Sequence, residues 1–334
     1  MTLPIIGITM GDPTGIGPEI IAKALSMEEP FRACRPVVFG DRGVLSRAIR
    51  IQNLSTTLEV ITKIPEDGYL PGKIFLLGLS RLEIASLHFG KPDRACGEAM
   101  VKYIEEAVKR VRKGELDAIT TCPINKQAMN LAGYSFPGHT ELLAHLSQSS
   151  PVAMMFLGSK WKIVLVTTHL PMKDVSRWIT ASRILSTIRL TDEGMKKYFG
   201  VAHPKIGVLG LNPHCGEDGL LGEEEKKEIL PAIAEAKLLG MDVEGPFPAD
   251  SFFDISGRYA FDAVISMYHD QGLIPIKMLD FKEAVNFTLG LPFVRTSVDH
   301  GTAYDIAGKG VADPANLVKA ISTAANLSKT KRDY

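Results

Sequence analysis

The sequence predicts an α/β fold with a largely parallel sheet. Short runs of apolar, mostly β-branched residues alternate along the chain with longer amphipathic stretches, which is typical of parallel strands joined by helices. The 334 residues are enough for two packed domains or one large α/β unit. No Ser/Gly-rich linker or repeat marks a domain boundary.

The expected strands are short and rich in Ile, Val and Leu, as strands buried on both faces are. In chain order they are Ile5–Met10, Pro36–Phe39, Lys73–Leu77, Ala118–Thr121, Val152–Leu157, Lys162–Thr167, Lys205–Leu209 and Asp262–Ser266.

The expected helices show apolar residues at helical spacing with charged residues on the other face. They are Pro18–Ser26, Gly97–Lys113, Glu141–Ser147, Ala181–Phe199, Gly222–Leu239 and Pro314–Leu327.

Composition excludes some classes of function. With 38 basic and 38 acidic residues the formal net charge is zero, so no long-range field attracts nucleic acid or an anionic membrane. No apolar stretch approaches the ~18 residues of a membrane span. The four cysteines form no CxxC pair, and no signal peptide is recognised, so we expect reduced thiols and a cytoplasmic location.

A glycine-rich loop, residues 11–19, follows the first expected strand and leads into a helix. Pro18 suits the first helical turn, because the N–H it lacks would be unpaired there. The loop matches neither the dinucleotide fingerprint nor the phosphate loop. A simple tight turn and a ligand-facing loop both remain open.

Gly138-His139-Thr140-Glu141 precedes another expected helix. Thr140 is a candidate N-cap, and Glu141 would complement the positive end of the helix dipole. His139 could present its ring there to a phosphate group. A plain capping turn is the alternative.

Three histidines each follow a strand-like run. His169, His214 and His269 are separated by 45 (214 − 169) and 55 (269 − 214) residues, so no sequence-local zinc motif applies. Ligands of open α/β sheets bind beyond the carboxyl ends of the strands. The three imidazoles could hold a divalent metal there, or be unrelated polar residues at strand ends.

Basic and amide side chains recur after His269, at Lys277, Asn286 and Arg295. Lys and Arg pair with phosphate oxygens, Arg in a bidentate way. Scattered surface cations are the alternative reading. Arg295 however has apolar neighbours, a setting in which an arginine usually has an anionic partner.

The segment from His300 to Gly310 is rich in glycine and small residues, so backbone can approach a ligand closely. In such a loop a carboxylate can accept hydrogen bonds from a ribose diol and would repel a 2′-phosphate. Asp305 would then select NAD over NADP.

Together these segments resemble the 4-hydroxythreonine-4-phosphate dehydrogenase family over essentially the whole chain. The resemblance runs through Gly15–Glu19, Gly138–Glu141, Thr167–Pro171, Leu211–His214, Met267–Gly272 and Thr288–Thr302. It implies an isopropylmalate dehydrogenase-like, two-domain α/β/α fold with the active site in the interdomain cleft. Residues 1–128 with 288–334 would form the cofactor-side domain, and residues 129–287 the substrate, metal and dimer-interface domain.

The resemblance also implies roles for residues, in an NAD- or NADP-dependent oxidation of a secondary alcohol assisted by Zn, Mg, Co, Mn or Ni. The metal ligands would be His169, His214 and His269, with His269 completing the site of the partner in a homodimer. Substrate phosphate would be bound by His139, Thr140, Lys277, Asn286 and Arg295. Cofactor contacts would come from His300, Gly301, Ala303 and Asp305. Asp270 and Lys126 are the candidate proton acceptors.

One departure concerns the substrate. Asp12 stands where the biosynthetic enzyme tends to have Glu, and Asp305 where it can have Glu, which favours a catabolic relative acting on 4-phosphoerythronate or 4-phosphothreonate. The expected reaction is an oxidation, with decarboxylation, of a small phosphorylated hydroxy acid such as 4-phosphohydroxy-L-threonine. A non-phosphorylated dihydrodiol dehydrogenase and a phosphate acyltransferase are the alternatives.

Overall fold

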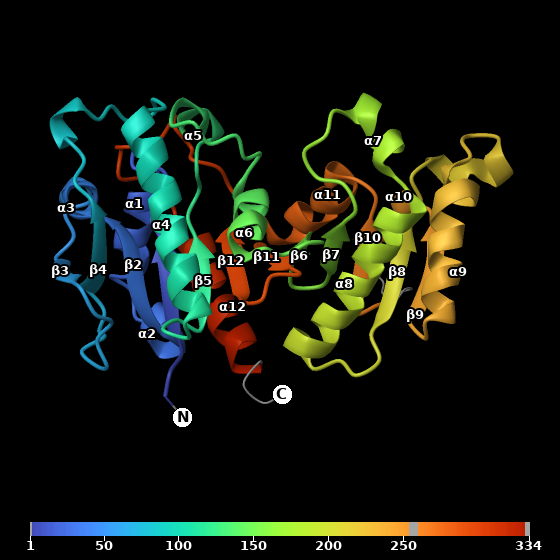
Figure 1. Ribbon diagram of the computed structural model, residues 1–334, viewed down its shortest axis with the longest axis horizontal. Helices are drawn as coiled ribbons and strands as arrows, with labels where there is room; N and C mark the ends of the chain where they lie inside the picture. The colour runs from blue at the N-terminus through green and yellow to red at the C-terminus, as the bar shows by residue number, and fades with distance from the viewer. Residues whose placement is uncertain (1, 254–259, 331–334) are drawn as a thin grey trace. The chain divides into compact units, whose positions relative to one another are not determined.

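The computed structural model describes residues 2–253 and 260–330, and it confirms the α/β fold (Figure 1). The chain divides into two compact units. Unit 1 runs to Ser149 and resumes at Leu291, and unit 2 is Ser150–Gly290.

The sheet of unit 1 is parallel throughout, in the order β3-β4-β2-β1-β5-β12. Its interior strands are almost wholly buried, as their Ile and Val content predicts. The strands are β1 (Ile5–Thr9), β2 (Arg35–Asp41), β3 (Thr57–Ile61), β4 (Lys73–Ser80), β5 (Ala118–Thr121) and β12 (Val294–Val298).

Helices connect these parallel strands and cover the sheet. They are α1 (Gly17–Ala24), α2 (Glu29–Ala33), α3 (Arg42–Ile51), α4 (Arg94–Arg112), α5 (Lys126–Leu131), α6 (His139–Ser147) and α12 (Ala315–Thr330). Pro18 lies in the first turn of α1, as predicted.

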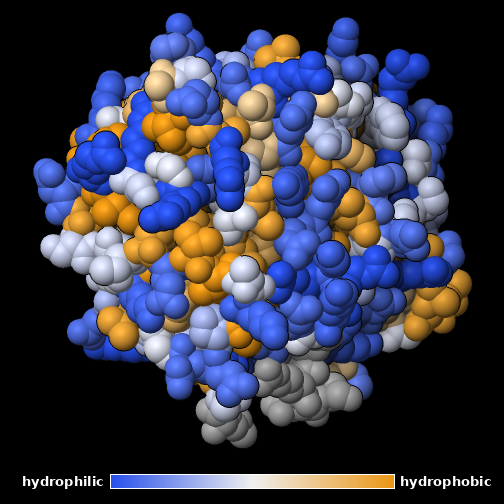
Figure 2. Space-filling model, turned by 60° about the vertical axis from the view of Figure 1, so that its left-hand side comes forward, coloured by the Kyte–Doolittle hydropathy of each residue, from blue (hydrophilic) through white to orange (hydrophobic). Residues whose placement is uncertain are grey.

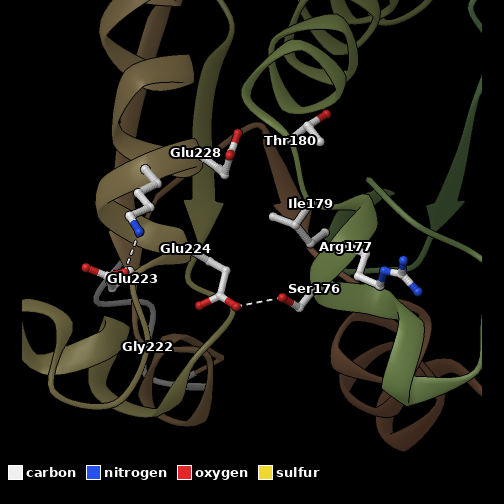
Figure 3. A pocket seen from close by; sticks show the side chains of 9 residues that line it. Ser176, Arg177, Ile179, Thr180, Gly222, Glu223, Glu224 and Glu228 are labelled. Atoms are coloured by element: carbon white, nitrogen blue, oxygen red, sulfur yellow. Dashed lines mark hydrogen bonds and ion pairs between the residues drawn. The ribbon is translucent and has the colours of Figure 1, made fainter.

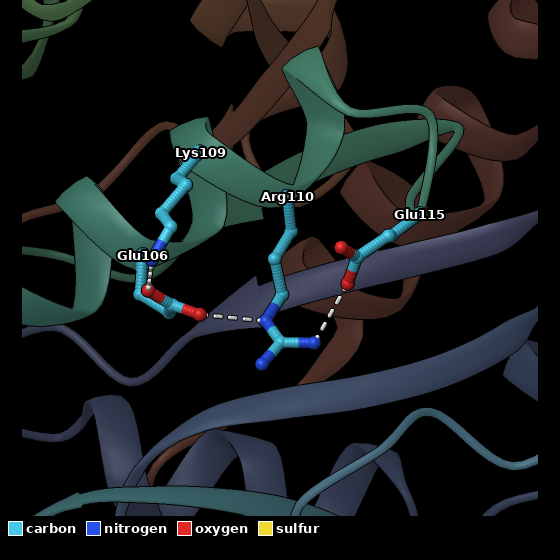
Figure 4. Close-up of polar contacts among 4 residues, drawn as sticks. All are labelled: Glu106, Lys109, Arg110 and Glu115. Atoms are coloured by element: carbon cyan, nitrogen blue, oxygen red, sulfur yellow. Dashed lines mark hydrogen bonds and ion pairs between the residues drawn. The ribbon is translucent and has the colours of Figure 1, made fainter.

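Helix α4 shows how the amphipathic pattern becomes structure. Its apolar face, including Val101 and Ile104, is buried against β1 and β2. On its outer face Glu106 pairs with Arg110 at 2.8 Å, and Arg110 reaches Glu115 at 2.8 Å (Figure 4). Ion pairs near the surface contribute little to stability, so the buried face accounts for the position of the helix.

The sheet of unit 2 has the order β11-β6-β7-β10-β8-β9. Strand β6 is antiparallel to both its neighbours, and the rest of this sheet is parallel. The strands are β6 (Ala153–Leu157), β7 (Lys162–Leu165), β8 (Lys205–Leu209), β9 (Asp242–Phe247), β10 (Ala263–Ser266) and β11 (Val285–Leu289).

The α-helices of unit 2 are α7 (Met172–Trp178), α8 (Ala181–Phe199), α9 (Leu230–Leu238), α10 (Ala249–Phe252) and α11 (His269–Asp280). Helix α8 has the bounds expected from the sequence, and both α8 and α11 pack against β7 and β10. The core cluster on this sheet includes Phe156, Ile163, Val264 and Leu273.

Four strands were not expected from the sequence, and the reasons differ. Strand β3 is a largely exposed edge strand, so it lacks a continuous apolar run. Strands β11 and β12 carry the polar residues Asn286 and Arg295 in their interiors. Strand β9 contains Gly245 and Pro246, which usually argue against a strand.

Helix α11 was also missed. It starts directly at His269 and contains Pro275, a residue that disfavours helix interiors. The expected helix over 222–239 is instead a π-helical turn, η3 (Glu225–Ile229), followed by α9.

The division into units falls at different residues from the expected domain boundaries. Residues 129–149 belong to unit 1, because α6 packs on α4 as α5 does. The return to unit 1 comes after Gly290, three residues beyond 287.

All four cysteines are free thiols. Hydrophilic and hydrophobic residues are mixed on the face shown in Figure 2. Among the described residues, none of the helices has the length and apolar character needed to cross a bilayer.

Candidate active site

The three histidines follow three neighbouring strands of unit 2. Strand β10 lies between β7 and β8 and is parallel to both, so all three strands end at the same edge of the sheet. His169 comes after β7, His214 after β8, and His269 directly after Tyr268 at the end of β10. This is the edge at which open α/β sheets bind ligands.

Two of the imidazoles meet within one chain. The ring centroids of His169 and His269 are 5.6 Å apart, with the ring planes tilted by 45°. His269 is the first residue of α11, and its side chain is 36% exposed. The predicted donation of His269 to a partner subunit is therefore not required for the His169–His269 contact.

Two of the three imidazole rings are each oriented by a carboxylate. Nδ1 of His269 lies 2.7 Å from Oδ1 of Asp270, and Nδ1 of His214 lies 2.6 Å from Oε1 of Glu217. The hydrogen bond that His214 donates to the Glu217 carboxylate raises the pKa of His214. Carboxylates bound to Nδ1 commonly leave Nε2 of a histidine to ligate a metal. The donor chemistry of these histidines therefore fits a divalent cation.

The described residues of one chain form no complete metal cage. Across residues 2–253 and 260–330, His, Cys, Asp and Glu form no group of three or more placed to hold a metal ion. His214 lies on a backbone of unusual conformation. Within η2 (Pro213–Gly219), the five residues from His214 to Asp218 all have left-handed φ angles.

The strand ends beneath the histidines are tied together by side chains that the sequence did not single out. The hydroxyl of Thr167 donates to the carbonyl of Met267 at 2.7 Å. Gln271 accepts from the amide of Met267 and donates to the carbonyl of Gly210, both at 2.7 Å. Thr167 and Gln271 thus connect the ends of β7, β10 and β8. Both lie within the family-like segments, but nothing in spacing alone reveals these bonds.

One pocket brings a predicted metal ligand and a predicted phosphate contact together. A cavity of about 500 Å³ is lined by His269, Asp270, Leu273, Ile274, Lys277 and Met278. Helix α11 places His269 and Lys277 on the same wall of this pocket. Asn286 lies on β11, and among the described residues its buried Oδ1 has no hydrogen-bond partner.

The two candidate bases occupy different settings. Asp270 binds the ring of His269 and is 72% exposed, so in this structure it orients a histidine. Lys126 is an exposed residue at the start of α5, which is capped by Asn125. The structure does not test either as the proton acceptor.

Unit 1 holds a buried cationic group. Arg295 on β12 is 1% exposed, and its Nη2 donates to Oγ1 of Thr121 on β5 at 2.6 Å. Burial lowers the pKa of Arg295 to about 9, and the nearby Glu141 carboxylate opposes that shift. Glu141 is therefore near enough to favour the charged form of this arginine.

His139 lies beside this arginine. Burial and the charge of Arg295 hold its pKa well below the usual value, so the ring is neutral. Its buried Nε2 has no hydrogen-bond partner among the described residues. An orphaned ring nitrogen next to a guanidinium suits a ligand with oxygen atoms.

Thr140 is buried, but its predicted capping role is wrong. Helix α6 begins at His139, and Gly138 occupies the N-cap position without a side-chain cap. Glycine can replace a capping side chain because the adjacent N–H groups stay accessible. That helix end keeps its N–H groups for another partner.

The predicted cofactor loop is braced from the N-terminal loop of the same unit. The hydroxyl of Tyr304 donates to Oδ2 of the buried Asp12. Glu19 accepts from the amides of Gly308 and Gly310 at 2.5 and 2.8 Å. The 11–19 segment is therefore a support for this loop, in addition to starting α1.

Loop residues that were predicted to contact the cofactor remain accessible. Gly301 and Asp305 are exposed, and a Cβ added at Gly301 would meet nothing within 4 Å. His300 bonds the carbonyl of Gly301 at 3.0 Å, and Ala303 has a left-handed φ of 44°. A rigid loop with an exposed carboxylate fits a nicotinamide cofactor's ribose.

Comparison with known proteins gives consistent matches. The family model for pyridoxal phosphate biosynthetic protein PdxA matches residues 32–324. A 4-hydroxythreonine-4-phosphate dehydrogenase of Desulforapulum autotrophicum is 50% identical over 323 residues, covering 96% of this chain and 95% of that protein.

Two further relatives match at similar length. A D-threonate 4-phosphate dehydrogenase of Cupriavidus necator is 45% identical, with 98% of each chain covered. The crystal structure of a 4-hydroxythreonine-4-phosphate dehydrogenase from Burkholderia phymatum superposes with a TM-score of 0.84 at 42% identity, covering 98% of this chain and 99% of that one.

Proposed function

Because this chain belongs to the family of pyridoxal phosphate biosynthetic protein PdxA, we propose that it is a dehydrogenase that oxidises the secondary alcohol of a small phosphorylated hydroxy acid. The observation that carries the proposal is the group around α11. His169 contacts His269, and His269 shares one pocket with Asp270 and Lys277. Imidazoles suit an alcohol-activating metal, and the lysine suits an anionic substrate.

The chain's own residues would bind and orient the reactants. His169, His214 and His269 would hold a divalent cation, which when bound lowers the pKa of the substrate hydroxyl. Lys277, Asn286, Arg295, His139 and Thr140 would bind the phosphate and fix the reacting carbon. His300, Gly301, Ala303 and Asp305 would contact the nicotinamide cofactor, which accepts the hydride. Asp305 favours NAD, and Asp270 or Lys126 would take up the proton.

Two substrates are candidates. The most similar relative described above acts, by its name, on 4-hydroxythreonine 4-phosphate, and the second on D-threonate 4-phosphate. Asp12 and Asp305, at positions where the biosynthetic enzyme tends to have Glu, favour the second. The family match supports a dehydrogenase over a phosphate acyltransferase. A cytoplasmic location stays a prediction.

The test is a panel of NAD and NADP reduction assays. The substrates are 4-phosphohydroxy-L-threonine, 4-phospho-D-threonate, 4-phosphoerythronate and a non-phosphorylated diol, each with and without exhaustive chelation. We expect turnover of one phosphorylated acid that stops on chelation and returns with added metal. Turnover that survives chelation would refute the metal role, and preference for the diol would refute the substrate class.

We also propose that the enzyme is a homodimer in which α11 takes part in the interface. Its side chains Ile274, Met278 and Phe281 are 59%, 79% and 73% exposed. Apolar exposure of this extent on one helix is typical of a surface that binds protein. Met278→Glu should convert a dimer to a monomer in light scattering, while Leu238→Glu, on the equally exposed α9 residue, should not.

A mixing experiment decides whether subunits share the site. If His269 serves the partner, a heterodimer of His169→Ala and His269→Ala chains contains one intact site. Random exchange would then restore about a quarter of wild-type activity. If His169 and His269 act within one chain, the mixture stays inactive.

A further inference from the structure

The position of His214 depends on a buried carboxylate of the π-helical turn η3. Glu225 is 3% exposed. Its Oε1 accepts from the backbone amides of Leu211 and Asn212 at 2.8 and 2.7 Å. Its Oε2 accepts from the side-chain Nδ2 of Asn212 at 2.9 Å. All three bonds go to Leu211 and Asn212, the two residues directly before Pro213.

The segment that follows these bonds is the turn η2. From His214 to Asp218 its backbone is left-handed, a conformation that is unfavourable for non-glycine residues. Such strain persists only where the surroundings fix it. Gly216 packs beside the same carboxylate, since a Cβ there would lie 2.9 Å from Oε2 of Glu225.

The three neighbouring carboxylates Glu224, Glu225 and Glu228 bind different parts of unit 2, and Glu224 shares only Asn212 with Glu225. Glu224 accepts from Oγ of Ser176 at 2.6 Å and from Nδ2 of Asn212 at 2.8 Å. Figure 3 shows Glu224 bonded to Ser176, and both residues line a cavity of about 540 Å³. Glu228 accepts from the amide of Ala181 at the start of α8. Among these three carboxylates, and within the described residues, Glu225 is the one that accepts hydrogen bonds from the backbone of the His214 segment.

The π-helical turn η3 explains how its carboxylates reach different neighbouring elements. A π-helix has a wider turn than an α-helix, and such turns often occur at functional sites. Within η3, Glu225 faces the end of β8 while Glu228 faces α8. The turn therefore connects the His214 segment to the body of unit 2.

We propose that Glu225 is a positioning residue for the metal site: by fixing Leu211 and Asn212 it holds the strained segment that presents His214. This inference rests on the proposed function, since it assumes that His214 ligates a cation. Residues that orient metal ligands commonly change metal affinity by ~10- to 100-fold when replaced.

The test measures Co²⁺ binding by the purified full-length protein, through calorimetry and the visible absorption of bound Co²⁺. Glu225→Gln should weaken binding ~10- to 100-fold and alter the absorption bands. Glu228→Gln is the matched control, because it removes a carboxylate of the same turn that also accepts a backbone amide. It should leave Co²⁺ affinity within about twofold of wild type.

A second variant covers the case in which Glu225→Gln fails to fold. Asn212→Ser removes the side-chain bonds of Nδ2 to Glu225 and Glu224 and keeps both backbone bonds to Glu225, so Co²⁺ binding should weaken less, ~3- to 10-fold. Hydrogen exchange should also become faster for the amides of 211–218 in both variants, and stay unchanged in Glu228→Gln.

The outcomes separate the two proposals. Wild-type Co²⁺ affinity and spectrum in Glu225→Gln, or in Asn212→Ser if the first variant is unfolded, overturns the role of Glu225. Wild-type protein that binds Co²⁺ no more tightly than His214→Ala overturns the metal site itself, and with it this inference.

Discussion

The His139–Arg295 pair of unit 1 and the histidines of unit 2 are polar sites built in opposite ways. Arg295 is 1% exposed and His139 is partly buried, and burial shifts the pKa of both downward. His214 and His269 are 65% and 36% exposed and are oriented by carboxylates. Packing within unit 1 fixes Arg295 and His139. Hydrogen bonds to carboxylates fix His214 and His269 at the edge of the unit 2 sheet.

The difference indicates what each region needs in order to act. Buried groups such as Arg295 and His139 are preorganised, so an anion meets them without rearrangement. Exposed imidazoles keep Nε2 accessible, so they depend on side chains such as Asp270, Glu217 and Glu225 for their orientation. Variants should therefore fail differently in the two regions.

The largest effect is expected for His214→Ala. Loss of one of the three proposed imidazole ligands should lower kcat by about 1000-fold or more, because metal affinity falls. Affinity for NAD, measured by fluorescence titration, should change little. A large loss of NAD binding would contradict the separation of the metal site from the cofactor loop.

The next largest effect is expected for Arg295→Met, which tests the buried group of unit 1 against the exposed histidines of unit 2. Without the guanidinium, kcat/KM for the phosphorylated substrate should fall about 100-fold or more. The fold should persist, because a buried charge can often be replaced by an apolar side chain. An equal loss for a dephosphorylated analogue would show that Arg295 does not recognise phosphate.

A smaller effect is expected at the cofactor loop. Tyr304→Phe removes the hydrogen bond to Asp12, and KM for NAD should rise about 10-fold while kcat stays nearly constant. Steady-state kinetics with NAD as the varied substrate tests this. Tyr69→Phe is a suitable control, since Tyr69 bonds a backbone carbonyl outside this loop. A change in kcat alone would argue against a role in binding the cofactor.

The smallest effect is expected in the pH dependence of the free energy of unfolding. The pKa of His139 is lowered in the fold, so at pH values below about 6.5 the unfolded chain binds a proton that the folded chain resists. Stability should be constant above that pH and decrease as pH falls through it, by up to about 1.4 kcal/mol per pH unit. Urea unfolding at pH 7.5 and 5.5 should show a smaller decrease for His139→Gln than for wild type.

Much of the fold could be predicted because buried strands and helices have a regular pattern of apolar residues in the sequence. Strand β8 and helix α8 have the predicted bounds, since each is a continuous buried run or an amphipathic repeat. Strands β11 and β12 could not be predicted, because the polar residues Asn286 and Arg295 interrupt their apolar pattern.

The candidate site divides in the same way. The histidines were visible as polar residues after apolar runs, and the structure places all three at one sheet edge. Thr167, Gln271 and Glu225 gave no such signal, because their partners are backbone atoms that lie far away in sequence. Bonds to backbone depend on the fold and leave no residue-specific pattern.

The left-handed stretch from His214 to Asp218 bears on how this protein could be engineered. Glycine relieves such a backbone, so Cys215→Gly or Asp218→Gly is a natural choice for raising the melting temperature. The same replacement at His214 or Glu217 would remove the imidazole or its carboxylate. Thermal robustness and turnover therefore compete within five consecutive residues, and a library that varies this stretch should yield stable but inactive clones alongside improved ones.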